Sequence, residues 1–192
     1  MELIELNVVM DDRIAPERSA ARIASRLEAQ LKKLLSMLHI ADAQWSIAIV
    51  GDQQMKALHK QTMNLSSTTD VLTFDMREKR KRPMKDREGD RVELDSVLCW
   101  DEAQRRAVEL GHDISHELLL YALHSLLHVQ GYEDCTPARY RRMHGREDEL
   151  LSAIGVGRVF AGGVRETRRR PKDAPKRIAK KITKKREGSS AR

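Results

Sequence analysis

Two histidines four residues apart have the types and the spacing to bind one metal ion. His124 and His128 lie in an otherwise apolar stretch, and residues four apart on a helix project from one face on successive turns. Gly131 can end such a helix in a left-handed conformation, which turns the chain back toward that face. Asp134 then comes near the pair. Two imidazoles and a carboxylate suit one catalytic zinc ion with a fourth position left for water.

Several other assignments of this segment stay open. Histidines at this spacing also line polar seams of helices, although burying imidazoles on an apolar helix is unfavourable without partners. Glu133 or Cys135 could replace Asp134 as the third ligand, and a structural zinc site would use Cys135 as its fourth ligand. A zinc peptidase of the His-Glu-x-x-His type needs a glutamate as general base after the first histidine. Ser125 stands there, which argues against a peptidase.

Two acidic residues are candidates for the catalytic site. Glu117 precedes His124 by two helical turns on roughly the same face, so it is a candidate partner of the histidines. Asp70, with Thr69 beside it, could line the site from a neighbouring strand or cap that strand instead. The general base is not identified. His116 is expected at the edge of the site, and the other histidines are expected at the surface: His39, His59, His112 and His144.

Hydrophobic periodicity predicts the elements that position these residues. Alternating or apolar runs predict strands over residues 2–9, 45–50, 71–76 and 92–100. Apolar residues spaced by three and four predict helices over residues 17–38, 52–63, 101 onward, 115–129 and 137–154, with Asp52 and Thr136 as caps. The charged stretch 77–91 is expected to be a loop. This order predicts an α+β domain, in which a small mixed four-stranded sheet packs with about five helices around a central metal-binding helix.

Positive charge is concentrated at the C-terminal end of the chain. Residues 164–192 hold 13 Lys and Arg against 3 acidic residues, a net charge of +10, which leaves −3 of the total +7 for residues 1–163. A segment this charged and this poor in apolar residues is expected to be disordered when free. We therefore expect one catalytic domain over 1–163, and a tail that attracts RNA phosphates or only aids solubility. The expected RNA contacts are Arg168, Arg169, Arg170, Lys180, Lys181, Lys184, Lys185 and Arg186.

Cysteine usage and the N-terminus predict the compartment. Cys99 and Cys135 are far apart and form no disulfide framework, which is typical of a reducing environment. The N-terminus lacks the pattern of a signal peptide, and no stretch approaches the length of a membrane span. These features predict a cytoplasmic protein without membrane contact.

The segment 117–134, ELLLYALHSLLHVQGYED, resembles the signature of the YbeY family of bacterial rRNA-maturation endoribonucleases. That signature is a glutamate followed by H-G-x-L-H-L-x-G-Y-D-H. The stretches 69–74 and 94–98 are similar to the family's T-D-V-L-S-F and G-D-I-V-I strands. Met143 and Glu147 fall where the family keeps a methionine and a glutamate. The resemblance covers residues 4 to 152 and is much more specific than the histidine pair alone.

The resemblance implies an α+β fold, one zinc ion and single-strand-specific cleavage of RNA. It also implies a role in 16S rRNA 3′-end maturation and ribosome quality control, with ribosomal RNA and the small ribosomal subunit as partners. The alternative is a zinc-containing ribosome- or RNA-binding protein with weak or no nuclease activity.

Three positions depart from the family pattern. Asp134 stands in place of the third zinc-binding histidine, and because a carboxylate is also a zinc ligand, we expect the site to persist with altered affinity. Met63 replaces a functionally important arginine and cannot contact phosphate, which lowers the expected cleavage efficiency. Ser125 replaces the glycine after the first histidine, a change that the sequence does not explain.

Overall fold

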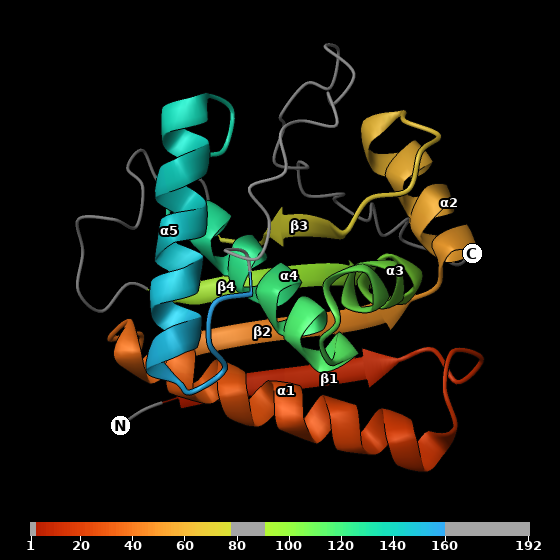
Figure 1. The fold of residues 1–192 in the computed structure, drawn as a ribbon, viewed down its shortest axis with the longest axis horizontal. Coiled ribbons are helices and arrows are strands. Elements are labelled where there is room, and N and C mark those ends of the chain that lie inside the picture. Colours follow the sequence, from red (N-terminus) through yellow and green to blue (C-terminus); the bar gives the residue numbers. More distant parts are fainter. Residues whose placement is uncertain (1–2, 78–90, 160–192) are drawn as a thin grey trace, which may run out of the picture.

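A computed structural model describes residues 3–77 and 91–159 of the chain. Four strands form one mixed sheet in the order β1-β2-β4-β3, where β2 runs parallel to β1 and β4 while β3 is antiparallel to β4. The strands are β1 (Leu3–Met10), β2 (Asp42–Val50), β3 (Val71–Asp75) and β4 (Val92–Cys99). The helices are α1 (Glu17–Met37), α2 (Asp52–Met63), α3 (Trp100–Leu110), α4 (Ile114–Val129) and α5 (Pro137–Ala153) (Figure 1). The predicted α+β fold is confirmed.

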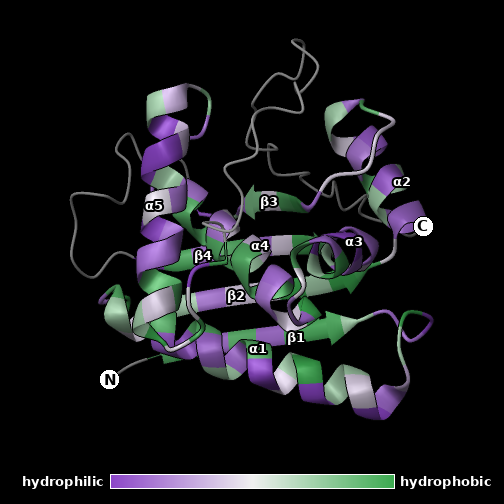
Figure 2. Ribbon diagram, in the orientation of Figure 1, coloured by the Kyte–Doolittle hydropathy of each residue, from purple (hydrophilic) through white to green (hydrophobic). Residues whose placement is uncertain are grey.

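Side-chain alternation along the strands determines which face of the sheet the helices cover. In β2, Trp45 and Ile47 are buried while Gln44 and Ser46 are exposed, because successive side chains of a strand point to opposite faces. Helices α1 and α4 pack on the buried face, against β1 and against β3 and β4 respectively. Hydrophilic residues follow the outer side of α1 and much of α5 (Figure 2). One face of the sheet is therefore buried in the main core.

Helix α4 lies at the centre of that core. Except for the partly buried Leu120, its leucines are fully buried, and they share one cluster with the apolar stripe of α1 and the inward side chains of β2 and β4. Burying an aliphatic side chain contributes about 1.5–3 kcal/mol, so this helix is held rigidly. A smaller cluster joins α2 to the sheet through Val50, Met55, Leu72 and Cys99. Any functional group on α4 is thus positioned by the whole core.

Element boundaries agree with the sequence predictions to within a few residues. Strand β2 begins earlier than predicted, at Asp42. This residue pairs with Leu3, and every residue of β1 has a partner on β2. The predicted capping role of Asp52 is wrong: Gly51 is the N-cap of α2, and the Asp52 N–H donates to the Asp101 carboxylate over 2.6 Å. Thr136 caps α5 as predicted.

Two sets of predictions fall on residues that the structure does not describe. The charged stretch around 78–90 lies outside the described residues, as do the domain boundary at 163 and the basic segment 164–192 with all its expected RNA contacts. Within the described part of the chain, none of the helices has both the length and the apolar character needed to cross a bilayer.

Candidate metal centre

Local chain geometry brings the predicted ligands together at the end of α4. The helix is capped at its start by Asp113, whose carboxylate accepts the Ser115 N–H over 2.8 Å. It ends before Gly131, which has a φ of 87° and so occupies the left-handed region predicted for it. The following N–H of Tyr132 then donates back to the Leu127 carbonyl over 2.9 Å. This turn carries the next residues back over the histidine face.

The two histidines of α4 face each other through their Nε2 atoms, which lie 3.0 Å apart. The Nδ1 of His128 is 3.0 Å from the carbonyl oxygen of Tyr132, and because a carbonyl can only accept, this nitrogen carries the hydrogen. The Nδ1 of His124 is 2.7 Å from Oε1 of Glu147 and donates to that carboxylate. In their neutral forms, both histidines therefore present a bare Nε2 lone pair to the same point.

Two lone pairs 3.0 Å apart repel each other unless a cation lies between them. The cation is either a proton on one ring or a metal ion bound to both. Two nitrogens on one tetrahedral zinc ion lie about 3.3 Å apart, given Zn–N distances of roughly 2.0–2.1 Å. The observed spacing and the fixed tautomers therefore fit a divalent ion without rearrangement of the helix.

The predicted third ligand lies beside this pair. Ligand atoms of His124, His128 and Asp134 all lie within 4.8 Å of one another. The two alternatives contact a different partner: the Glu133 carboxylate pairs with Arg139, and the Cys135 thiol is 3.5 Å from the same guanidinium. The geometry thus favours Asp134 over Glu133 and Cys135 as the third ligand.

A buried carboxylate from α5 holds the histidines, and the sequence had not assigned it a role. Glu147 is fully buried, and its second oxygen lies 2.5 Å from Nδ1 of His144, so one carboxylate orients two imidazoles. The rings of His124 and His144 are stacked with centroids 5.9 Å apart. Such an outer carboxylate fixes the tautomer of a metal-binding histidine. A second group of residues that could hold a metal ion consists of His124, His144 and Glu147. It shares His124 with the first group.

Electrostatics agree with this arrangement. Burial works to raise the pKa of Glu147, but hydrogen bonds from His124 and His144 outweigh it and hold that pKa below its ordinary value. Burial works to lower the pKa of His124, but the hydrogen bond and charge of Glu147, with the charges of Asp70 and Asp134, raise it above its ordinary value. The space between the two Nε2 atoms is therefore a site that attracts cations.

The two predicted acidic residues lie in different places. Glu117 is buried near the start of α4, and its Oε1 is 2.7 Å from Nε2 of His112; the carboxylate beside His124 comes from Glu147 instead. Asp70 accepts hydrogen bonds from the Val71 N–H and the Thr69 hydroxyl, both 2.9 Å, which is the capping arrangement considered for it. Its charge nevertheless acts on His124.

The Ser125 hydroxyl has hydrogen-bond partners in the sheet that the sequence did not reveal. Its hydroxyl is fully buried between α4 and the sheet, 2.7 Å from the Ser96 hydroxyl and 3.0 Å from that of Thr73. The chain of bonds continues to the Trp45 indole, which donates to Ser96 over 2.9 Å. The residue after the first histidine thus ties α4 to β3 and β4 and offers no general base to a peptidase.

The prediction that the remaining histidines lie at the surface is wrong for most of them. His59 is only 8% exposed, and its Nδ1 lies 2.7 Å from the Ser67 carbonyl oxygen. His112 and His144 are partly buried, each beside a buried glutamate. Only His39 is exposed as predicted. A backbone carbonyl for His59 and buried carboxylates for His112 and His144 supply the partners that make burial of an imidazole tolerable.

Fold and site together define an α+β protein with a candidate single-metal centre of two histidines and a carboxylate on its central helix. The chain belongs to the endoribonuclease YbeY family, whose sequence model matches residues 11–155.

Individual relatives agree with this assignment. A Corynebacterium efficiens protein named endoribonuclease YbeY is 39% identical over 114 residues, which are 58% of this chain and 57% of that protein. The namesake from an Anaeromyxobacter species is 38% identical over 140 residues, 72% of this chain and 67% of that one. A Staphylococcus aureus relative of the same name is 35% identical over 120 residues, 61% and 76% of the two chains. The match thus spans little more than half of the Corynebacterium protein.

A solved structure has the same fold. The solution structure of a Thermotoga maritima protein superposes with a TM-score of 0.50, covering 78% of this chain and 91% of the other at 19% identity. At this identity the likeness extends to the fold alone.

Proposed function

We propose that this protein is a zinc-dependent endoribonuclease that cleaves single-stranded RNA. Family membership supports the reaction class, and the paired Nε2 atoms with their fixed tautomers support the metal. We further propose that its substrate is the 3′ end of 16S rRNA, that it acts with the small ribosomal subunit and in ribosome quality control, and that it works in the cytoplasm. These finer assignments rest on what the family resemblance implies.

His124, His128 and Asp134 would hold the ion, which when bound supplies a Lewis acid for a phosphate oxygen or for water. The residues of the chain itself define the surroundings. Glu147 holds the ring of His124 in the tautomer that leaves Nε2 bare, and the Tyr132 carbonyl does the same for His128. The negative charge of Asp134 would offset part of the charge of the ion. The direct test is zinc analysis of the purified protein together with cleavage of single-stranded and duplex RNA.

A zinc-containing RNA-binding protein with weak or no nuclease activity is the second candidate. It is favoured by Met63, the last residue of α2, where the family resemblance implies a phosphate-contacting arginine. A protein that binds zinc at one ion per chain and binds RNA, but leaves single-stranded RNA intact over long incubation, would fit this second candidate better.

Zinc is expected to bind more tightly as pH rises. At low pH a proton occupies the space between the Nε2 atoms of His124 and His128, where the ion would bind. The raised pKa of His124 stabilises the metal-free fold at pH values below the ordinary histidine value of 6.5, and this contribution is lost as pH rises through the raised value. The ion must displace that proton. We therefore expect the increase in melting temperature caused by zinc to grow from about pH 6 to about pH 8, with affinity rising up to roughly tenfold per pH unit.

Thermal melts with and without zinc across this range measure the effect. His39→Asn is a suitable control because His39 is exposed, is distant from the α4 pair in sequence and has a φ of 55°, which asparagine tolerates, so it should leave the profile unchanged. A zinc-induced shift that is constant with pH would contradict the competition between proton and metal.

Deleting residues 164–192 is expected to weaken binding of single-stranded RNA and to flatten its salt dependence. The segment carries 13 of the 36 Lys and Arg residues. Each phosphate contact on a single strand contributes a slope of about −0.7 in the logarithm of affinity against the logarithm of salt concentration. Titrations at several salt concentrations compare the full and shortened chains, with zinc content as the control for the intact site. An unaltered slope would show that the tail does not contact RNA.

A further inference from the structure

The first half of α5 is a basic surface. Between Cys135 and Arg146 the chain has four arginines and no acidic residue, and three of the four, Arg139, Arg141 and Arg142, are exposed on the first turns of the helix. Cations near a helix N-terminus oppose the helix dipole, so these side chains do not serve to stabilise α5. Their placement suggests that they contact an anion.

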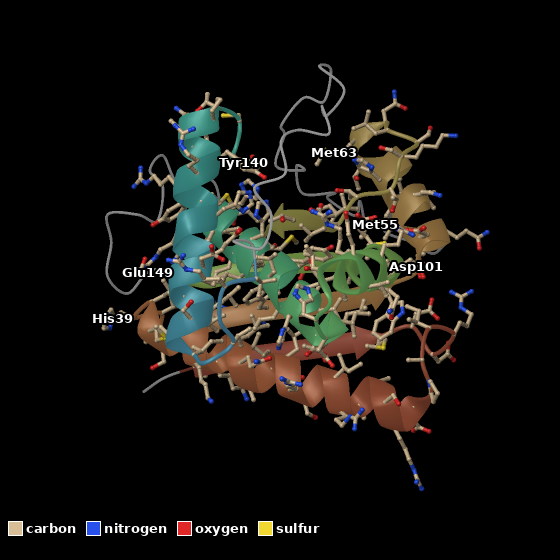
Figure 3. The ribbon with its side chains drawn as sticks, in the orientation of Figure 1. His39, Met55, Met63, Asp101, Tyr140 and Glu149 are labelled. Carbon is tan, nitrogen blue, oxygen red and sulfur yellow. The ribbon has the colours of Figure 1, made fainter. Side chains whose placement is uncertain are left out.

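A large aromatic side chain stands among these arginines. Tyr140 is 41% exposed, and its ring makes an edge-to-face contact with His144 at a centroid distance of 4.2 Å. The His144 ring stacks in turn on His124. Two ring contacts thus connect an exposed tyrosine to the first predicted metal ligand. Figure 3 shows Tyr140 at the β3 edge of the molecule, the same edge at which Met63 ends α2.

The arginines next to Tyr140 in the sequence differ in their partners. Arg142 lies over the Tyr132 ring, 5.4 Å from its centroid, and the Tyr132 carbonyl accepts the hydrogen bond of His128. This places a guanidinium on the side chain of the residue whose backbone carbonyl orients the second predicted ligand. Arg141 has no carboxylate partner within the described ranges 3–77 and 91–159, whereas Arg139 is neutralised by Glu133. Arg141 and Arg142 are therefore the cations best placed for phosphates.

We propose that Tyr140, Arg141 and Arg142 form a subsite for one unpaired nucleotide of single-stranded RNA, beside the metal centre. Tyr140 stacks on the base, and the two guanidinium groups contact the phosphates on either side. An aromatic ring combined with cations is the pattern by which proteins bind single strands, because every unpaired base has a face to stack. A base inside a duplex is not available to the ring. The subsite rests on the proposed function and deepens it by selecting single strands.

The test uses the full chain, with EDTA present to prevent cleavage, and a short single-stranded RNA that carries 2-aminopurine. Stacking on an aromatic side chain quenches the fluorescence of this base. A purely structural role of Tyr140 would not produce such quenching. We expect Tyr140→Ala to abolish the quenching and to weaken binding about tenfold or more, and Tyr140→Phe to retain both. Arg141→Gln should reduce the salt slope by about 0.7, while Arg22→Gln, on the exposed side of α1, should leave it unchanged.

Equal quenching and equal affinity in wild type and Tyr140→Ala would overturn the proposal. An effect of Tyr140→Phe as large as that of Tyr140→Ala would do so too, as would equal dependence on Tyr140 for duplex RNA. Cleavage by the zinc-loaded wild type is assayed separately, which keeps the two hypotheses apart. A cleaving protein that binds without Tyr140 refutes only the subsite, and Tyr140-dependent quenching by a protein that does not cleave refutes only the nuclease.

Discussion

Replacing His128 with alanine is expected to remove the bound zinc and to reduce RNA cleavage by about 10³-fold or more. The Nε2 of this residue is one of two bare nitrogens 3.0 Å apart, and a single histidine with one carboxylate is a poor zinc site. The lost rate corresponds to the several kcal/mol by which a bound ion stabilises developing charge. Zinc content by elemental analysis and initial rates on single-stranded RNA measure the two effects.

The fold of the His128→Ala variant should survive. The side chain of His128 is not part of the apolar cluster that α4 shares with α1 and the sheet, so its removal costs only its hydrogen bonds to the Tyr132 carbonyl and to His124. We expect the metal-free protein to lose at most about 1–2 kcal/mol of unfolding free energy. The matched control is again His39→Asn. Retention of one zinc per chain, or of wild-type cleavage, by His128→Ala would refute the role proposed for this residue.

Sequence patterns were sufficient for the elements and for the histidine pair. Helix α4 is apolar on most sides, so its burial at the centre follows from composition alone, and a spacing of four fixes two side chains to one face. Gly131 adds a turn of known direction, which made the position of Asp134 predictable as well. Each of these inferences concerns residues within one or two helical turns of each other, where chain geometry is local.

Contacts between separate elements were not predictable in this way. The bond from His124 to Glu147 spans 23 residues and joins α4 to α5, and the packing of two helices is set by the whole core rather than by either segment. One signal was present nonetheless. Glu147 falls in the buried stripe of α5 with Met143, Leu150 and Leu151, and an acid in an apolar stripe needs a buried partner. The partners of Ser125 on β3 and β4 were hidden for the same reason.

Glu147→Gln is the second change with a large expected effect, because it removes a proton acceptor without changing the shape of the side chain. The carboxylate accepts from two Nδ1–H groups, one on each oxygen. A glutamine has one acceptor oxygen, and its amide nitrogen can only donate. One of the two histidines must therefore move its hydrogen to Nε2. Where this histidine is His124, the nitrogen needed by the metal is blocked, and zinc affinity should fall about 10- to 100-fold.

Glu117→Gln is the matched control for this change. Glu117 is also a buried glutamate that contacts a histidine at 2.7 Å, but the contact is to His112 at the start of α4. Titration with a chelating dye as competitor should give a zinc affinity near wild type for Glu117→Gln and a much weaker one for Glu147→Gln. Equal losses in both variants would instead support the role first predicted for Glu117. They would also mean that buried charge in general, rather than the tautomer of His124, determines zinc binding.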